Sequence, residues 1–122
     1  MIDGAEHRLV ELLGAAERGP KRNGIFALWL VVRAAEAVLP PAPVSAKNHR
    51  RRLQAVASRL GGLALPAPLK RALAAACQHL EAATPRAAAV VLAQLTAPAR
   101  DVLGPEAAEA VTVAARAAKS HL

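Results

Sequence analysis

The sequence holds few cysteines and few aromatic residues, and both shortages exclude classes of protein. The chain of 122 residues has one Cys, one Phe, one Trp and no Tyr. A single Cys excludes a disulfide-stabilised scaffold and, with no secretory segment recognised in the sequence, predicts a reducing, cytoplasmic location. A wholly disordered chain is excluded because 54% of the residues are hydrophobic. The length predicts a single domain over residues 1–122.

Long apolar runs are also lacking. The apolar run Ile25–Val32 stops after eight residues at Arg33. A helix that crosses a membrane needs about 20 such residues. The run therefore predicts a buried helix, and we expect no membrane association.

What the sequence does contain is a strong helical pattern. β-branched residues are sparse, no stretch alternates apolar and polar residues for long, and Pro or Gly marks each joint. Apolar residues recur at helical spacing, which predicts an all-α fold, a compact bundle of five or six helices with the second and fifth innermost. The expected helices cover residues 3–18, 23–39, 44 or 45 to 60, 68–83, 85–95 and 105–120, with a short helical turn at 98–103.

Helix 23–39 is apolar on two sides. Leu28 belongs to one face, while Phe26 and Leu30 belong to a second face almost opposite. Such a helix lies at the centre of a bundle, or a partner chain covers one of its faces. The last helix is rich in Ala and buries little area per residue, so we expect it to be weakly held or held by a second subunit. Phe26, Leu30 and Val113 are the candidate interface residues of a homo-oligomer or assembly subunit.

Two local interactions follow from the spacing of particular residues. Trp29 and Arg33 are one helical turn apart, so the guanidinium group is predicted to stack on the indole ring. Thr84 precedes Pro85, and a hydroxyl followed by Pro at the first helical position predicts an N-cap at Thr84.

Acidic residues are absent from one part of the chain, and this absence carries the main functional signal. The formal net charge is +7, and the stretch 41–73 holds seven basic residues and no acidic one. Before and after this stretch the charges balance. A basic segment between two neutral ones is typical of a surface for a polyanionic partner. The candidate nucleic-acid-binding residues are Lys47, Arg50, Arg51, Arg52, Arg59, Lys70 and Arg71.

The basic segment favours contacts to phosphate over the reading of bases. The planar guanidinium group of Arg donates two hydrogen bonds to one phosphate. No aromatic residue interleaves with these charges along the sequence, which disfavours stacking on the bases of a single strand. We therefore expect a small non-enzymatic protein that binds the nucleic-acid backbone, alone or within a nucleoprotein assembly. The alternatives are an acidic protein partner, an oligomerisation or adaptor module with no nucleic-acid role, and a solvated basic face that reflects a GC-rich genome. A helix-turn-helix is disfavoured because the connection Gly61–Pro66 is longer than its usual turn.

Residues for catalysis are scarce. None of Ser45, Ser58 and Ser120 lies in a G-x-S-x-G pattern, and no cluster of titratable residues suggests an acid–base pair. We expect no enzyme activity and no cofactor.

Metal ligands are equally scarce. Cys77 and His79 are two residues apart and so do not share a helix face, which predicts no metal site and a Cys buried at the core edge. His49 lies on the apolar side of its helix; the pattern favours a hydrogen-bonded packing residue over a pH-sensitive contact.

Overall fold

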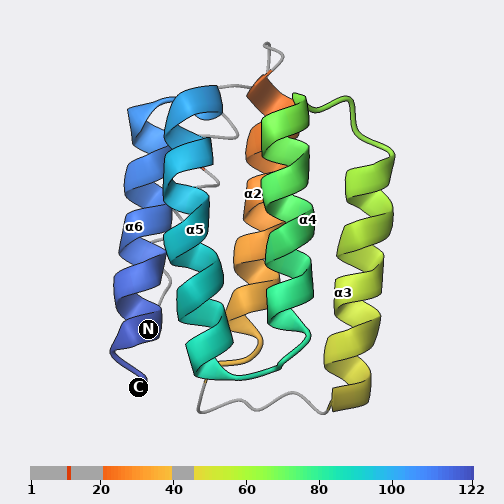
Figure 1. The fold of residues 1–122 in the computed structure, drawn as a ribbon, viewed down its shortest axis with the longest axis vertical. Coiled ribbons are helices and arrows are strands. Elements are labelled where there is room, and N and C mark those ends of the chain that lie inside the picture. The colour runs from red at the N-terminus through yellow and green to blue at the C-terminus, as the bar shows by residue number, and fades with distance from the viewer. Residues whose placement is uncertain (1–10, 12–20, 40–45) are drawn as a thin grey trace.

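Five α-helices build the described part of the protein (Figure 1). The computed structural model describes residue 11, residues 21–39 and residues 46–122. The expected helix 3–18, except residue 11, and the Pro-rich linker 40–43 lie outside the described residues. Within them no strand occurs, and the predicted all-α bundle is confirmed. The helices are α2 (Lys21–Glu36), α3 (Ala46–Gly61), α4 (Ala67–Leu80), α5 (Pro85–Leu103) and α6 (Pro105–Lys119).

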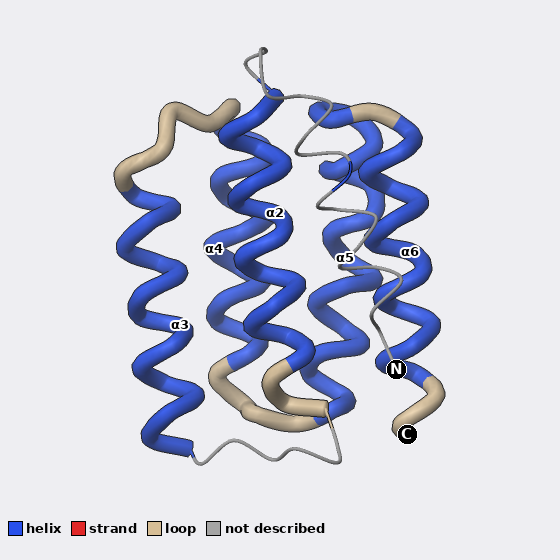
Figure 2. Tube along the Cα trace, turned by 180° about the vertical axis from the view of Figure 1, so that it is seen from behind, coloured by secondary structure: helices blue, strands red, loops and turns tan. Residues whose placement is uncertain are grey.

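Four of the helices stand in a row, and the fifth packs behind them. In Figure 1 the row runs α6, α5, α4, α3, with neighbouring helices antiparallel, and α2 lies behind α4 and α5. Figure 2, seen from behind, shows α2 in front of α4. The α2 helix packs against all four others, which confirms its predicted central position. Among the described helices, α3 contacts only α2 and α4, so it forms one edge of the bundle.

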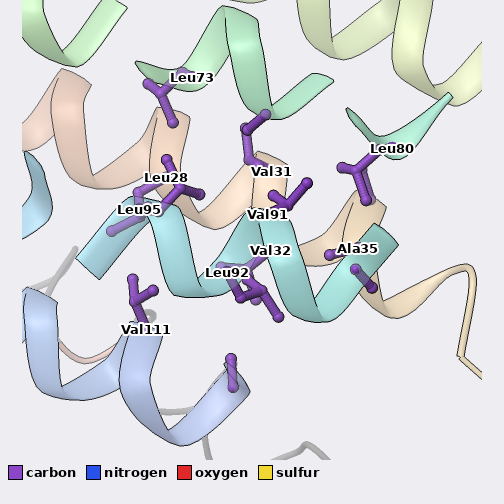
Figure 3. Close-up of a cluster of buried hydrophobic side chains, with 14 of the residues drawn as sticks. Leu28, Val31, Val32, Ala35, Leu73, Leu80, Val91, Leu92, Leu95 and Val111 are labelled. Carbon is purple, nitrogen blue, oxygen red and sulfur yellow. The ribbon is translucent and has the colours of Figure 1, made fainter. Parts of the chain in front are cut away.

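The core forms where the apolar faces of α2, α4, α5 and α6 meet. Gly24 allows a close approach here, because a Cβ atom at this position would lie 2.7 Å from Cδ2 of Leu103. Full burial of each large aliphatic side chain stabilises the fold by about 1.5–3 kcal/mol. The fully buried large side chains of these four helices are Leu28, Val31, Val32, Leu69, Leu73, Leu80, Val91, Leu92, Leu95 and Val111, many of them shown in Figure 3.

The prediction for the fifth helix is wrong at its C-terminal end. The sequence predicts a helix over 85–95 and a separate turn over 98–103, whereas α5 is continuous through Pro98. Proline removes one helical hydrogen bond and favours a break, at a cost of about 3 kcal/mol. The helix continues because Leu95 before it and Ala99 after it are both buried on the same side. Tertiary packing therefore overrides the local signal.

The two ends of α5 have clear stop and start signals. The Oγ1 atom of Thr84 accepts a hydrogen bond from the backbone N–H of Ala87 at 3.0 Å, which confirms the predicted N-cap. At the other end Gly104 has a φ of 104°, a conformation that favours glycine, and its N–H bonds to the carbonyls of Ala99 and Arg100.

The α6 and α3 helices differ in how much of their surface the other helices bury. The Ala-rich face of α6 is covered within the chain by α5 and α2, while the expectation that this helix is weakly held or held by a second subunit stays a prediction. In contrast, of the α3 side chains that the structure describes, residues 47–61, four are buried: His49, Leu53, Val56 and Leu60. The least covered of the described helices is thus the one that carries more basic residues than any other described helix. None of the helices in the described part of the chain combines the length and the hydropathy of a membrane-crossing segment.

Candidate nucleic-acid interface

The α3 helix carries five cations and no acid. Its apolar residues recur every three or four positions and turn one narrow side toward α2 and α4, which leaves the rest of its circumference to solvent. At a rise of about 1.5 Å per residue its 16 residues extend about 24 Å. The basic side chains on this helix are all exposed: Lys47, Arg50, Arg51, Arg52 and Arg59.

These cations do not form a single stripe. Arg52 and Arg59 line a groove between α3 and α2, whereas Arg50 lines a second groove between α3 and α4. By helical periodicity Lys47 and Arg51 lie on the side of α3 opposite the buried His49. The helix therefore presents positive charge in three directions.

The basic residues of α4 extend this surface on one side only. Lys70 is exposed and lines the same α3–α4 groove as Arg50. Arg71 is exposed but does not line either groove. Helical periodicity turns Arg71 about 100° away from Lys70, so it lies on the outer side of α4.

The charges on α3 have no acidic partner among the described residues. Within the described part of the chain, no ion pair joins Lys47, Arg50, Arg51 or Arg52 to an acidic side chain. The guanidinium group of Arg59 lies 5.6 Å from the centre of the Phe26 ring, an interaction that leaves its charge in place. Among the described residues, nothing reduces the positive field of α3 toward an external anion.

The groove between α2 and α3 brings aromatic rings among the basic residues, contrary to the expectation from the linear sequence. Phe26 and Trp29 of α2 are 6.1 Å apart between ring centres, with a tilt of 31°. Arg33 lies 5.8 Å from the Trp29 ring, which confirms the predicted stack. Residues three and four apart share a helix face, so these rings and Arg33 turn together toward Arg59 of α3. From the sequence, Phe26 and Leu30 on this face of α2 are candidate interface residues, and only the spacing of Trp29 and Arg33 indicates that the face is cationic.

The groove between α3 and α4 is larger and mixed in charge. It has a volume of about 650 Å³. Arg50 and Lys70 contribute positive charge to its walls, but Glu81 contributes an acidic group. The α2–α3 groove, with a volume of about 270 Å³, is lined by three Arg residues and no acidic one. For an anionic ligand the smaller groove is therefore the better match.

His49 joins α3 to α4 as a buried packing residue. Its side chain is 2% exposed, and its Nε2 atom donates to the backbone carbonyl of Leu80 at 2.5 Å. A carbonyl only accepts, so Nε2 carries the proton. The Nδ1 atom is buried and has no hydrogen-bond partner among the described residues. The packing interpretation of His49 is confirmed.

Replacing His49 with Leu is expected to change the free energy of unfolding by less than about 1 kcal/mol. Leu fills a similar volume and removes the buried unpartnered nitrogen. The Leu80 carbonyl keeps a donor, because the N–H of Ala83 also bonds to it at 2.9 Å. Urea unfolding at neutral pH measures the change. A loss above about 2 kcal/mol would contradict the prediction and show that the His49 hydrogen bond holds α3 in place.

Cys77 lies at the core edge, as predicted. Burial raises the pKa of its thiol, and the nearby carboxylate of Glu81 raises it further. A raised pKa keeps the thiol protonated and unreactive at neutral pH. Its neighbour His79 is exposed, and the described residues contain no group of three His, Cys, Asp or Glu side chains placed to hold a metal ion.

The three candidate interface residues lie on different parts of the bundle. Phe26 and Leu30 are half-buried on α2, toward the α3 edge. Val113 is 42% exposed on α6, at the opposite end of the row of helices (Figure 1). One turn away on either side of it are Glu109 and Arg116, which are also exposed. The structure does not gather these residues into one apolar patch, and the expected homo-oligomer stays a prediction.

Comparisons of the chain with protein families, with curated proteins and with solved structures find no match.

Proposed function

We propose that this protein binds the phosphate backbone of nucleic acid through α3, without catalysis, either alone or as a subunit of a nucleoprotein assembly. The observation that carries the proposal is the set of five exposed cations on one helix that has no acid. Polyanion binding depends on such a concentration of unneutralised Lys and Arg, because each contact releases counterions from the phosphates.

The position of α3 in the bundle supports the same proposal. As the edge helix of the described bundle it contacts only α2 and α4, so neighbouring cations on its outer side can reach one nucleic-acid strand together. Four of the five are Arg, whose planar fork suits phosphate. The C-terminal part of the bundle adds no net charge, because residues 74–122 hold four basic and four acidic residues. The positive pole of the described structure is therefore the α3 edge.

Salt dependence tests the proposal directly. With about five phosphate contacts, a plot of log K against log salt concentration is expected to have a slope of about −4 to −5 on duplex DNA, and about −3.5 on a single strand. Fluorescence anisotropy of labelled duplex DNA, single-stranded DNA and RNA, each at several salt concentrations, measures the slope.

Absence of binding to all three probes at low salt would overturn the proposal. The basic surface would then be assigned to an acidic protein partner, or the chain to an oligomerisation module. Cross-linking of the purified protein, followed by identification of the linked residues, would distinguish these two alternatives. A homo-oligomer would show links near Phe26, Leu30 or Val113.

A further inference from the structure

The α2–α3 groove combines two features that the proposed backbone contacts do not use. The first is a set of aromatic rings: Trp29 lines the groove, and Phe26 lies beside it on the same helix face. They are the only aromatic residues of the chain, and both lie here. The second is apolar lining from Leu30, Ala34 and Val56. A surface for phosphate alone needs neither feature.

The cations of this groove are placed around the rings. Arg33 lies 5.8 Å from the Trp29 ring, and Arg59 lies 5.6 Å from the Phe26 ring. Along α3, Arg52 and Arg59 are seven residues apart, which separates them by about 10 Å along the helix axis. Both line the groove, so a planar group that enters it meets aromatic and apolar surface together with guanidinium groups.

We propose that this groove receives one unpaired base of a single-stranded nucleic acid, with Trp29 as the stacking surface and Arg52 and Arg59 on the flanking phosphates. This inference rests on the proposed function. Stacking on aromatic side chains is the usual way in which proteins hold single strands without reading sequence. The volume of about 270 Å³ is at the lower limit of ligand pockets, which suits one planar ring system. A duplex keeps its bases stacked inside and has no ring to offer.

The fluorescence of the protein reports on this groove alone. Trp29 is the only Trp and the chain has no Tyr, so emission excited in the indole band comes from the groove. Titration with a thymidine oligonucleotide of about 12 residues is expected to quench Trp29 emission, while a duplex of equal length is expected to bind more weakly and leave the emission unchanged. Anisotropy of the labelled oligonucleotides, measured in parallel, gives the binding itself.

A pair of groove-filling variants separates the base pocket from the charged surface. Ala55 lines the α2–α3 groove and Ala57 lines the α3–α4 groove; both are exposed residues of α3. Ala55→Leu is expected to lower single-strand affinity about tenfold. It should leave duplex binding and the salt slope unchanged, because no charge is lost. Ala57→Leu, the matched control, should leave single-strand affinity unchanged.

The outcomes are distinct. Binding of single strands without a change in Trp29 emission, or equal effects of the two variants, would overturn the base pocket and leave the backbone proposal intact. A failure of every nucleic acid to bind in the anisotropy measurement would overturn both. Circular dichroism of both variants, compared with the parent protein, confirms that the bundle is folded.

Discussion

Replacement of Arg50, Arg51 and Arg52 by Ala is expected to lower affinity for nucleic acid by a factor of about 10² to 10³ at 0.1 M salt. The three residues are exposed and adjacent on α3. Each lost phosphate contact removes about 0.9 from the magnitude of the salt slope on duplex DNA. The slope is therefore expected to fall from about −4.5 to about −2. Ala favours helix as well as Arg does, so α3 is expected to remain folded.

A matched control removes the same charge from another part of the bundle. Arg86, Arg100 and Arg116 are exposed on α5 and α6, away from the α3 edge (Figure 1). Their joint replacement by Ala also lowers the net charge by three, but it is expected to change affinity less than about fivefold, through the long-range field alone. If both triple variants lost affinity equally, net charge and not the α3 surface would explain the binding.

Leu92→Ala is expected to give the largest loss of stability from a single substitution that leaves every charge in place. Leu92 is fully buried and belongs to a cluster with Val32 of α2 and Val111 of α6 (Figure 3). The substitution leaves a cavity between helices whose positions are fixed by other contacts, at a cost of about 2–5 kcal/mol. Since a domain of this size is stable by about 5–15 kcal/mol, the Tm should fall by roughly 10 °C.

Val113→Ala is the control for this loss. Val113 is 42% exposed on α6, so its truncation is expected to change stability by less than about 0.5 kcal/mol. Urea and thermal unfolding followed by circular dichroism measure both variants. We expect the neighbouring side chains to fill the cavity only in part. A loss below about 1 kcal/mol for Leu92→Ala would show instead that the cluster repacks around the shorter side chain.

Much of the fold follows from local sequence patterns. The spacing of apolar residues predicts all five described helices, because burial of one side of a helix needs a period near 3.6. The two-sided apolar pattern of 23–39 predicts its central position, and α2 does pack against every other described helix. Thr84 caps α5 as its position before Pro85 predicts. These features depend on neighbours within a few residues, which a sequence displays directly.

The errors arise where contacts distant in sequence outweigh the local signal. Pro98 predicts a helix end, yet α5 continues, because the residues on both sides of it are buried by other helices. The packing of α6 is likewise visible only in the structure, where its short Ala side chains are buried against α5 and α2. A propensity of a few kcal/mol is smaller than the burial free energy of the several side chains involved.

The sequence by itself determined that the protein is helical, that its positive charge is concentrated between residues 41 and 73, and that α3 carries most of it. Only the tertiary structure decided what surrounds that charge. It placed α3 at the edge of the bundle, distributed its cations in three directions, and brought Phe26 and Trp29 to Arg59. The physical reason is that the charge of a stretch of chain is the sum of the charges of its consecutive residues, which the sequence displays. A groove forms only where two helices pack side by side, which depends on the tertiary structure.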